Sequence, residues 1–121
     1  MSTSSPTSVS SKDRQALTDK YRLLLLEDIV PFWLRHGIDD THGGVFTCVQ
    51  GDGAWISKDK YLWSQGRAIW TFAALFNRIK PEPRFLEIAS QTTDFVLHHG
   101  REKKGTVLFR ISGEGPPWDQ P

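Results

Sequence analysis

The sequence contains a single cysteine, Cys48, so it can form neither an internal disulfide nor a cysteine-based zinc site. This scarcity excludes disulfide-stapled small proteins and favours a reducing compartment, so we expect a cytoplasmic protein. No apolar run approaches the roughly 18–20 residues that a membrane-spanning helix needs, and we expect no membrane partner. The first eleven residues lack a basic segment and an apolar core, so they do not indicate a secretory signal.

An excess of charge of either sign is also missing. Fifteen Lys and Arg residues stand against fourteen Asp and Glu residues, which leaves a formal net charge of +1. Because the basic residues do not gather into one stripe, nothing in the sequence predicts binding to nucleic acid. The length of 121 residues suits a single domain, and the hydrophobic content of 38% is typical of a globular protein once the ten glycines are added.

The start of the chain differs in composition from the rest. Eight of the first eleven residues are serine or threonine, and none is a large apolar residue apart from Met1 and Val9. Such a segment cannot bury enough apolar surface to fold. We therefore predict a disordered leader over residues 1–12 and a folded region over residues 13–121.

Residues 13–36 show the apolar spacing of a helix, with steps of three and four residues. The residues that set this period are Leu17, Tyr21, Leu24, Leu25, Ile29, Phe32 and Trp33. Pro31 lacks a backbone N–H, so we expect a kink or a break near Val30. Gly37 predicts the end of the helix, at a position where a left-handed conformation is common.

Two further helices are predicted at about residues 63–80 and 84–99, separated by Pro81 and Pro83. Residues 68–77 carry no charge and are apolar on nearly every side, so we expect that helix to be covered all round. The later helix is amphipathic, which predicts an outer position facing solvent. Its apolar face is formed by Phe85, Leu86, Ile88, Ala89, Phe95 and Val96, and its polar face by Glu87, Gln91, Asp94 and His98.

Short β-prone runs separate the helices. Residues 45–49 and 54–56 flank a Gly-Asp-Gly turn at 51–53, a pattern that predicts a small hairpin. Residues 106–111 predict another strand. A shift of 62 positions places Val45 on Val107 and the Gly-Asp-Gly turn on residues 113–115, each downstream of a helix that ends in His-Gly. This similarity indicates a repeated unit of helices and a loop.

Metal and cofactor motifs are missing as well. The four histidines are His36, His42, His98 and His99, and no pair has the spacing of a metal site. We expect His36 and His99 to stabilise helix ends. Gly43-Gly44 and Gly51-Asp52-Gly53 lack the Lys-Ser/Thr pair of a phosphate-binding loop, and their glycines do not follow the G-x-G-x-x-G order of a dinucleotide-binding fold. We therefore predict no metal and no cofactor.

Arg67 is the residue most suggestive of a ligand. It begins an otherwise uncharged helix and lies between Trp63 and Trp70 at helical spacing. Aromatic rings around a planar hydrogen-bonding group are typical of sugar sites, because the rings pack on the apolar sugar faces. Two structural interpretations stay open: the guanidinium extends into solvent, or it pairs with Asp59 or Glu27.

Several motifs, taken in order and spacing, resemble one family. They are residues 31–39 (PFWLRHGID), 42–46 (HGGVF), 52–53 (DG), 59–60 (DK), Trp63, 65–67 (QGR) and Trp70. The similarity continues through Phe85, Leu86, Ala89, residues 94–95, His99, Phe109 and Gly115. Over roughly residues 20–115 the chain thus resembles the amino-terminal part of the N-acylglucosamine 2-epimerase family, which includes cellobiose 2-epimerases, mannose isomerases and renin-binding proteins.

The resemblance implies an all-α fold, part of an (α/α)6 barrel, with a sugar site at one end. It implies that Arg67 contacts the sugar near its reacting carbonyl, and that Trp63 and Phe109 also contact the substrate. The implied substrate is a small sugar, an aldose or an N-acylhexosamine. In the family a histidine removes the proton next to the aldehyde, and a second histidine returns it on the opposite face.

The catalytic histidines of the family lie further along the chain, and no histidine here has a matching position. The resemblance therefore implies an amino-terminal fragment that is inactive alone; self-association through the exposed apolar face of the second helix belongs to a separate, non-catalytic hypothesis. Two other functions stay open. A glycoside hydrolase or lyase would use two carboxylates, and Asp39, Asp40 and Asp59 are available, although acids beside glycines are usually turn formers. A non-catalytic interaction module is the other.

Overall fold

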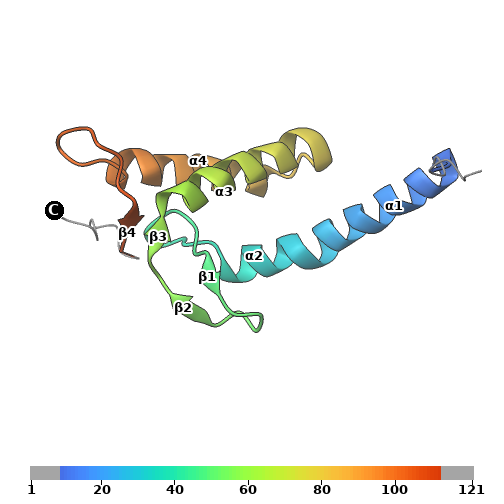
Figure 1. Ribbon diagram of the computed structural model, residues 1–121, viewed down its shortest axis with the longest axis horizontal. Coiled ribbons are helices and arrows are strands. Elements are labelled where there is room, and N and C mark those ends of the chain that lie inside the picture. The colour runs from blue at the N-terminus through green and yellow to red at the C-terminus, as the bar shows by residue number, and fades with distance from the viewer. Residues whose placement is uncertain (1–8, 113–121) are drawn as a thin grey trace, which may run out of the picture. The chain divides into compact units, whose positions relative to one another are not determined.

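The computed structural model describes residues 9–112, and nearly all of their regular structure is helical (Figure 1). The chain divides into two compact units, Met1–Pro31 and Phe32–Pro121. Residues 1–8 of the predicted leader lie outside the described part, as do residues 113–115 of the predicted repeat. Among residues 9–112, no helix is both long enough and apolar enough to cross a membrane.

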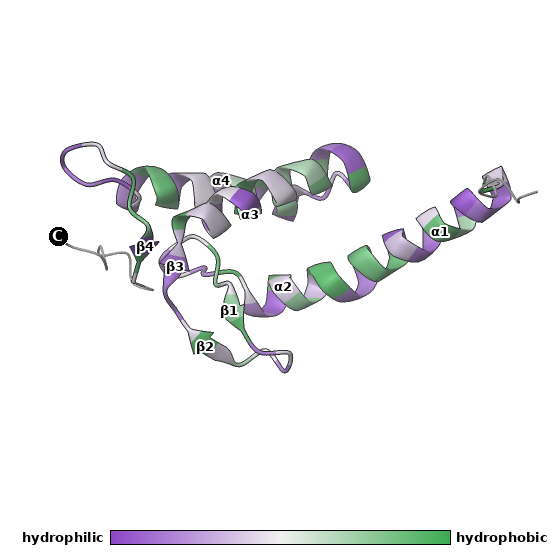
Figure 2. Ribbon diagram, viewed as in Figure 1, coloured by the Kyte–Doolittle hydropathy of each residue, from purple (hydrophilic) through white to green (hydrophobic). Residues whose placement is uncertain are grey.

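The first unit is one helical rod. Helix α1 spans Ser11–Leu24 and begins two residues before the predicted start, because the Ser10 hydroxyl accepts a hydrogen bond from the Asp13 N–H at 3.1 Å. None of its residues is buried. Apolar and polar residues alternate along the ribbon in Figure 2, as the helical period predicts. The helix then passes into η1, a π-helical segment at Leu25–Ile29.

Of the kink or break predicted near Val30, the break is wrong, because the chain stays helical there and changes its helix type. Helix α2 spans Val30–His36 and follows η1 directly. The Val30 N–H bonds to the Leu25 carbonyl, five residues back, in place of the usual four. Such π turns are one of the ways in which a helix adjusts near a proline that cannot donate.

The helix ends at His36, as predicted, but not for the predicted reason. Gly37 donates to the Trp33 carbonyl at 2.7 Å and does not adopt the left-handed conformation. A β-carbon at Gly37 would lie 2.6 Å from the Trp33 ring. Glycine is therefore needed here because the indole packs over the position, and the expected left-handed cap is wrong.

Helices α3 and α4 form the body of the second unit and lie side by side (Figure 1). Helix α3 spans Leu62–Ala74 and continues as a π-helical segment, η2, over Leu75–Ile79, while α4 spans Pro83–His99. Both therefore start within one residue of the predicted positions. The α3–α4 contact is apolar and includes Phe72 and Phe85, whose ring centroids lie 6.1 Å apart.

Two short antiparallel ladders connect to this helix pair. Strand β1, Cys48–Val49, pairs with β2, Trp55–Ser57, which confirms the predicted hairpin. Strand β3, Lys60–Tyr61, pairs with β4, Arg110–Ile111, so only the end of the predicted strand at 106–111 joins a ladder. The second ladder covers a small core of Leu62, Phe95, Leu108 and Ile111.

Side-chain burial agrees with the predictions in part. Within residues 32–112 helix α4 covers one side of α3, and Trp63 and Trp70 are 62% and 65% exposed, as expected if a helix that needs cover all round lies in a chain too short to supply it. On α4, Leu86 is exposed although it was placed on the apolar face, and Thr92 is fully buried. Gln91, placed on the polar face, binds a loop.

The predicted repeat is present in the backbone of the two loops that follow His36 and His99. Gly37 and Gly100 each donate to the carbonyl four residues back, and their own carbonyls accept from Phe46 and Leu108. Single antiparallel bridges join Ile38 to Val45 and Arg101 to Val107. Gly43 and Gly105 take equivalent places, with φ of 87° and 86°. We name these segments loop 1 (residues 38–46) and loop 2 (residues 101–108).

Candidate functional site

A buried ion pair holds loop 1 to the strand that precedes α3. The Lys60 ammonium donates to the Asp39 carboxylate at 2.5 Å and to the Gly43 carbonyl at 2.7 Å. Lys60 is fully buried and Asp39 is 4% exposed. The ammonium also lies 4.9 Å and 4.7 Å from the ring centroids of Phe46 and Phe95, where their π-electrons stabilise it. The pair thus fixes where β3 and α3 begin.

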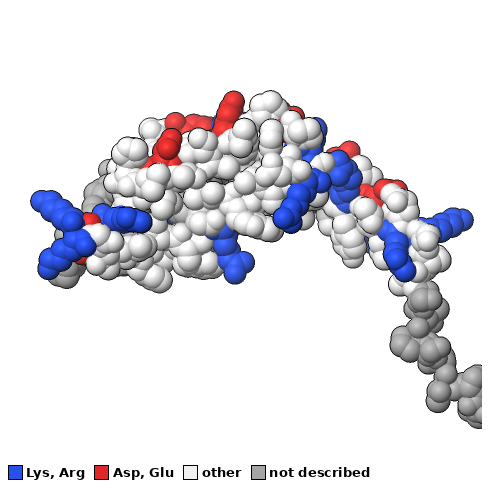
Figure 3. All heavy atoms as spheres, turned by 90° about the horizontal axis from the view of Figure 1, so that it is seen from above, with Lys and Arg blue, Asp and Glu red and all other residues white. Residues whose placement is uncertain are grey.

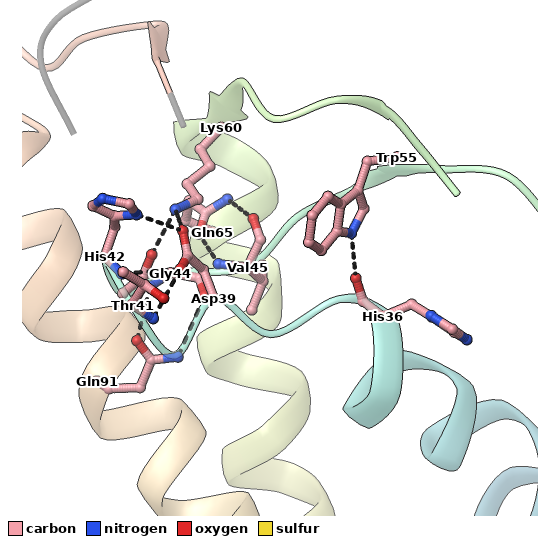
Figure 4. Close-up of polar contacts among 11 residues, drawn as sticks. His36, Asp39, Thr41, His42, Gly44, Val45, Trp55, Lys60, Gln65 and Gln91 are labelled. Carbon is pink, nitrogen blue, oxygen red and sulfur yellow. Dashed lines mark hydrogen bonds and ion pairs between the residues drawn. The ribbon is translucent and has the colours of Figure 1, made fainter. Parts of the chain in front are cut away.

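Two glutamine side chains complete this attachment (Figure 4). Gln65 of α3 accepts from the Val45 N–H and donates to the Val45 carbonyl, both at 2.8 Å. Gln91 of α4 accepts from the Gly44 N–H at 2.8 Å. A carboxamide can satisfy an N–H and a C=O of one residue together, so each helix binds the loop backbone as a strand would. Gln65 was noted only as part of the family motif and Gln91 only as part of the polar face of its helix, so neither was predicted to bind a loop.

The carboxylate of Asp39 is the hydrogen-bond centre of loop 1. Its Oδ1 accepts from the N–H groups of Thr41 and His42 at 3.0 and 2.9 Å, which confirms the turn-forming interpretation. Burial tends to raise the pKa of Asp39, but the bonds from Lys60, His42 and Thr41 hold that pKa below its ordinary value of 3.8. Burial lowers the pKa of Lys60 from 10.5, and Asp39 opposes this.

Acid is expected to weaken this unit through Asp39. Because the folded-state pKa lies below 3.8, the stabilisation is fully present above that value and is lost as the pH falls through the lowered pKa. Urea unfolding of the wild type and of Asp39→Asn, followed by circular dichroism from about pH 7 to pH 2, measures this loss. The stability difference between the two proteins should shrink below pH 3.8. A constant difference across that range contradicts the assignment.

The three predicted substrate residues lie at the amino-terminal end of α3 or beside it. Arg67 extends over the Trp63 ring, with its guanidinium carbon 5.7 Å from the ring centroid. Among residues 32–112, no carboxylate pairs with Arg67, so the proposed pairing with Asp59 is not found. Trp70 lies on the same stripe one further turn along and is equally exposed.

Phe109 reaches this end of α3 through the second ladder. Its carbonyl accepts from the Leu62 N–H at 3.1 Å, and its ring meets the Tyr61 ring edge to face at 5.4 Å. Phe109 itself is 64% exposed. The structure therefore places Trp63, Arg67 and Phe109 at one end of the helix, with their rings open to solvent. We call this set the aromatic face.

The aromatic face can bind a ligand but lacks a base among the described residues. His42 lies in loop 1, with its Nδ1 3.6 Å from Asp39, and His98 bonds the Asp94 carbonyl at 2.7 Å. The His99 ring packs on Phe95 at 5.1 Å. None of these contacts involves Arg67. Exposed rings beside a permanent cation can stack on a sugar ring and bind its oxygens.

A separate open pocket of about 460 Å³ lies between loop 1 and α4, and its lining does not include the aromatic face. Polar side chains line it, among them Asp40, His42, Arg84 and His98. Arg84 binds Asp40 at 3.1 Å, and this hydrogen bond raises the pKa of the arginine. In the described part of the chain, no three acidic, histidine or cysteine side chains are grouped so as to hold a metal ion.

Lysine and arginine side chains lie at several separate places on the face shown in Figure 3. Two of the three carboxylates named for a hydrolase are used otherwise: Asp39 belongs to the buried pair and Asp40 binds Arg84. The bond of Asp59 to the Ser57 hydroxyl, at 3.1 Å, comes from its backbone N–H and not from its carboxylate. Two free carboxylates facing one another across a sugar are not found among these three residues.

Sequence comparison relates the chain to sugar epimerases, although no family model matches it. It is 35% identical over 78 residues to the N-acylglucosamine 2-epimerase of Rattus norvegicus, covering 63% of this chain and 19% of that protein. It is 24% identical over 93 residues to the cellobiose 2-epimerase of Bacteroides fragilis, covering 75% and 24%. The chain thus spans a quarter or less of the curated relatives that it matches.

Solved structures agree on the fold. The cellobiose 2-epimerase of Bacillus thermoamylovorans matches 87% of this chain and 27% of its own, with a TM-score of 0.76 and 22% identity. The match to the cellobiose 2-epimerase of Spirochaeta thermophila covers 93% of this chain and 28% of that protein, with a TM-score of 0.75 and 28% identity. The match to a D-mannose isomerase covers 93% of this chain and 26% of that protein, with a TM-score of 0.69 and 18% identity. The predicted fold class is confirmed, since the described helices correspond to part of an (α/α)6 barrel.

Proposed function

We propose that this chain, which matches part of the N-acylglucosamine 2-epimerase family, forms the sugar-binding wall of an epimerase or isomerase site. The resemblance suspected from the sequence is confirmed over that region. The proposed ligand is a small sugar, an aldose or an N-acylhexosamine. The proposed reaction class is proton transfer at the carbon next to the sugar carbonyl.

One observation carries this proposal: Arg67 lies over the Trp63 ring with no carboxylate partner in residues 32–112. An arginine that served the fold would be expected to pair with an acid or a carbonyl. Its five N–H donors instead remain for a ligand rich in oxygen. Exposed indole and phenyl rings at the same helix end supply surfaces on which the apolar face of a pyranose packs.

In the proposed chemistry, Arg67 binds the sugar oxygen on which negative charge develops. A base removes the proton from C2 of the open-chain aldose, and the electron pair forms an enediolate whose negative charge lies on the C1 oxygen. The guanidinium stabilises that oxygen, an effect worth about 3–4 kcal/mol for a single donor in a dry site. Return of the proton to the opposite face of C2 gives the epimer, whereas its return to C1, with transfer of the C2 hydroxyl proton to the C1 oxygen, gives the ketose.

We infer that the bases lie outside residues 9–112, since no described histidine contacts Arg67 or its ring partner. Imidazole suits this role because its pKa lies near neutral pH. The 121-residue chain alone should therefore bind sugar without turning it over. Turnover of N-acetylmannosamine, mannose or cellobiose by the purified chain would contradict this inference.

Replacing Arg67 with glutamine should weaken sugar binding at least tenfold, because the charge and the forked donors are both lost. Calorimetric titration of the chain with N-acetylglucosamine and with cellobiose measures the affinity. Arg78→Gln is the matched control, since Arg78 is exposed and lies in η2, the helical segment that continues α3. Equal weakening by both variants, or no binding by the wild type, contradicts the proposal.

Self-association is a second candidate, and the exposure of Trp63 and Trp70 on α3 favours it. Burying an indole removes a large apolar area from water, so two such rings can hold copies together. Light scattering of the wild type and of Trp70→Ser tests this function. Concentration-dependent oligomers that the substitution abolishes, without any sugar affinity, would favour a non-catalytic module over a sugar site.

A further inference from the structure

Loop 1 and loop 2 have the same pattern of backbone hydrogen bonds, and in each loop the pattern surrounds one valine, Val45 or Val107. Around the Ile38–Val45 bridge, the Asp39 N–H donates to the Gly44 carbonyl and the Phe46 N–H to the Gly37 carbonyl. Loop 2 repeats this pattern: the Glu102 N–H donates to the Thr106 carbonyl and the Leu108 N–H to the Gly100 carbonyl. In this type of antiparallel pair the bridged residues do not bond each other. The N–H and C=O of both valines therefore point out of their loops.

In loop 1 these outward groups are bound by the segment that enters α3. Gln65 takes both the N–H and the carbonyl of Val45 at 2.8 Å. Five residues earlier, Lys60 donates to the carboxylate of Asp39 and to the carbonyl of Gly43. One segment thus closes the loop with a cation and a carboxamide, and Val45 is 5% exposed as a result.

Loop 2 offers the same groups without such a segment. Val107 occupies the place of Val45 but is 62% exposed, and within residues 9–112 no hydrogen bond reaches its N–H or its carbonyl. Glu102 occupies the place of Asp39, and its carboxylate forms no ion pair among the described residues. The Gly105 carbonyl corresponds to that of Gly43.

We propose that loop 2 is a docking site for a polypeptide segment with the chemistry of residues 60–65. The occupant carries a lysine or arginine that binds Glu102 and the Gly105 carbonyl. Five residues later, at the start of a helix, it carries a glutamine or asparagine that binds both backbone groups of Val107. Charge and hydrogen-bond complementarity select this occupant, because loop 2 presents one acid and an unpaired N–H and C=O at the spacing that Lys60 and Gln65 match in loop 1.

In the equivalent attachment of loop 1 the side-chain hydrogen bonds come from Lys60 and Gln65 and not from Arg67 or Trp63, so the two proposals are tested on different side chains. Water satisfies Val107 while the site is open, so the loop holds its conformation without an occupant. Docking replaces those waters by a carboxamide and adds an ion pair in a partly buried place. Its strength should therefore depend on both the cation and the carboxamide.

A labelled synthetic peptide of residues 58–80 provides the probe, because it contains the segment that closes loop 1. Fluorescence anisotropy measures its binding to the full 121-residue chain, and amide shifts in NMR spectra report where it binds. We expect the Val107 and Glu102 amides to shift. A peptide carrying K60M and Q65L should bind at least tenfold more weakly.

Chain variants separate docking on loop 2 from displacement of the chain's own α3. Glu102→Gln should weaken peptide binding about fivefold, the usual scale for loss of a partly exposed ion pair, whereas Lys103→Gln on the same loop should change it less than twofold. Shifts at Val45 instead of Val107, equal binding of the two peptides, or no binding of either would overturn the proposal.

Discussion

Replacing Lys60 with methionine is expected to lower the free energy of unfolding by about 3–5 kcal/mol. The side chain is fully buried, and methionine fills much of its volume. The loss arises because the Asp39 carboxylate, 4% exposed, keeps its charge without a counter-ion. The Gly43 carbonyl loses a donor as well. Urea unfolding followed by far-UV circular dichroism gives the magnitude.

Two companion variants identify the cause. Asp39→Asn combined with Lys60→Met removes both charges, and its amide oxygen can still accept from Thr41 and His42. We expect the pair of substitutions to recover at least half of the lost stability, since neutral replacement of a buried pair is often tolerated. Lys58→Met is the control, because Lys58 is exposed and its ammonium lies over the Trp55 ring at 4.8 Å, a contact worth about 0.5–1 kcal/mol.

The combined variant can also contradict the explanation. If it is as unstable as Lys60→Met alone, the buried charge of Asp39 is not the source of the loss. Packing of the lysine stem between Phe46 and Phe95 would then account for it. Loss of as much stability in Lys58→Met would indicate a general effect of removing positive charge.

The helices of this chain were predictable because their signals are local. Residues 84–99 show a 3.6-residue period and follow two prolines, so α4 begins within a residue of the expected start. The hairpin followed from a Gly-Asp-Gly turn between β-prone runs. The repeat was visible because Val45 and Val107 stand 62 positions apart, each downstream of a helix that ends in His-Gly. The structure adds that Gly43 and Gly105, also 62 positions apart, both have positive φ.

The polar attachment of loop 1 was not predictable from local signals. Lys60 meets Asp39 across 21 positions, and Gln65 meets Val45 across 20. A lysine in a mostly polar segment normally predicts an exposed side chain, since lysine is almost never fully buried without a partner. Only the fold brings that partner near. The one available signal was the family motif that contains residues 59–60 and 65–67.

The aromatic face shows where sequence and structure agree in part. Trp63, Arg67 and Phe109 were chosen from the resemblance, and the structure brings them to the start of α3. Their role in binding sugar stays a prediction. The composition of α3 calls for cover all round, and within residues 32–112 Trp63 and Trp70 stay exposed, because apolar composition indicates what a helix can bury but not which neighbour covers it.

Replacing Gly44 with alanine is expected to lower the free energy of unfolding by about 2–5 kcal/mol. Gly44 has φ of 78°, a left-handed conformation that disfavours any β-carbon. The new methyl group would also lie 2.8 Å from the Gln65 Oε1 and 3.0 Å from the Phe95 ring, both of which are buried. Relieving that overlap would break the bonds that Gln65 makes to Val45. Thermal and urea unfolding measure the loss.

Gly105→Ala separates the two causes, because Gly105 has φ of 86° but open space around its β-carbon position. Backbone strain alone acts there, so we expect a loss of only about 1–2 kcal/mol. The excess at Gly44 then measures crowding against Gln65 and Phe95. Equal losses at the two glycines would mean that the loops tolerate the methyl group alike, and that the contact between loop 1 and α3 is looser than its distances indicate.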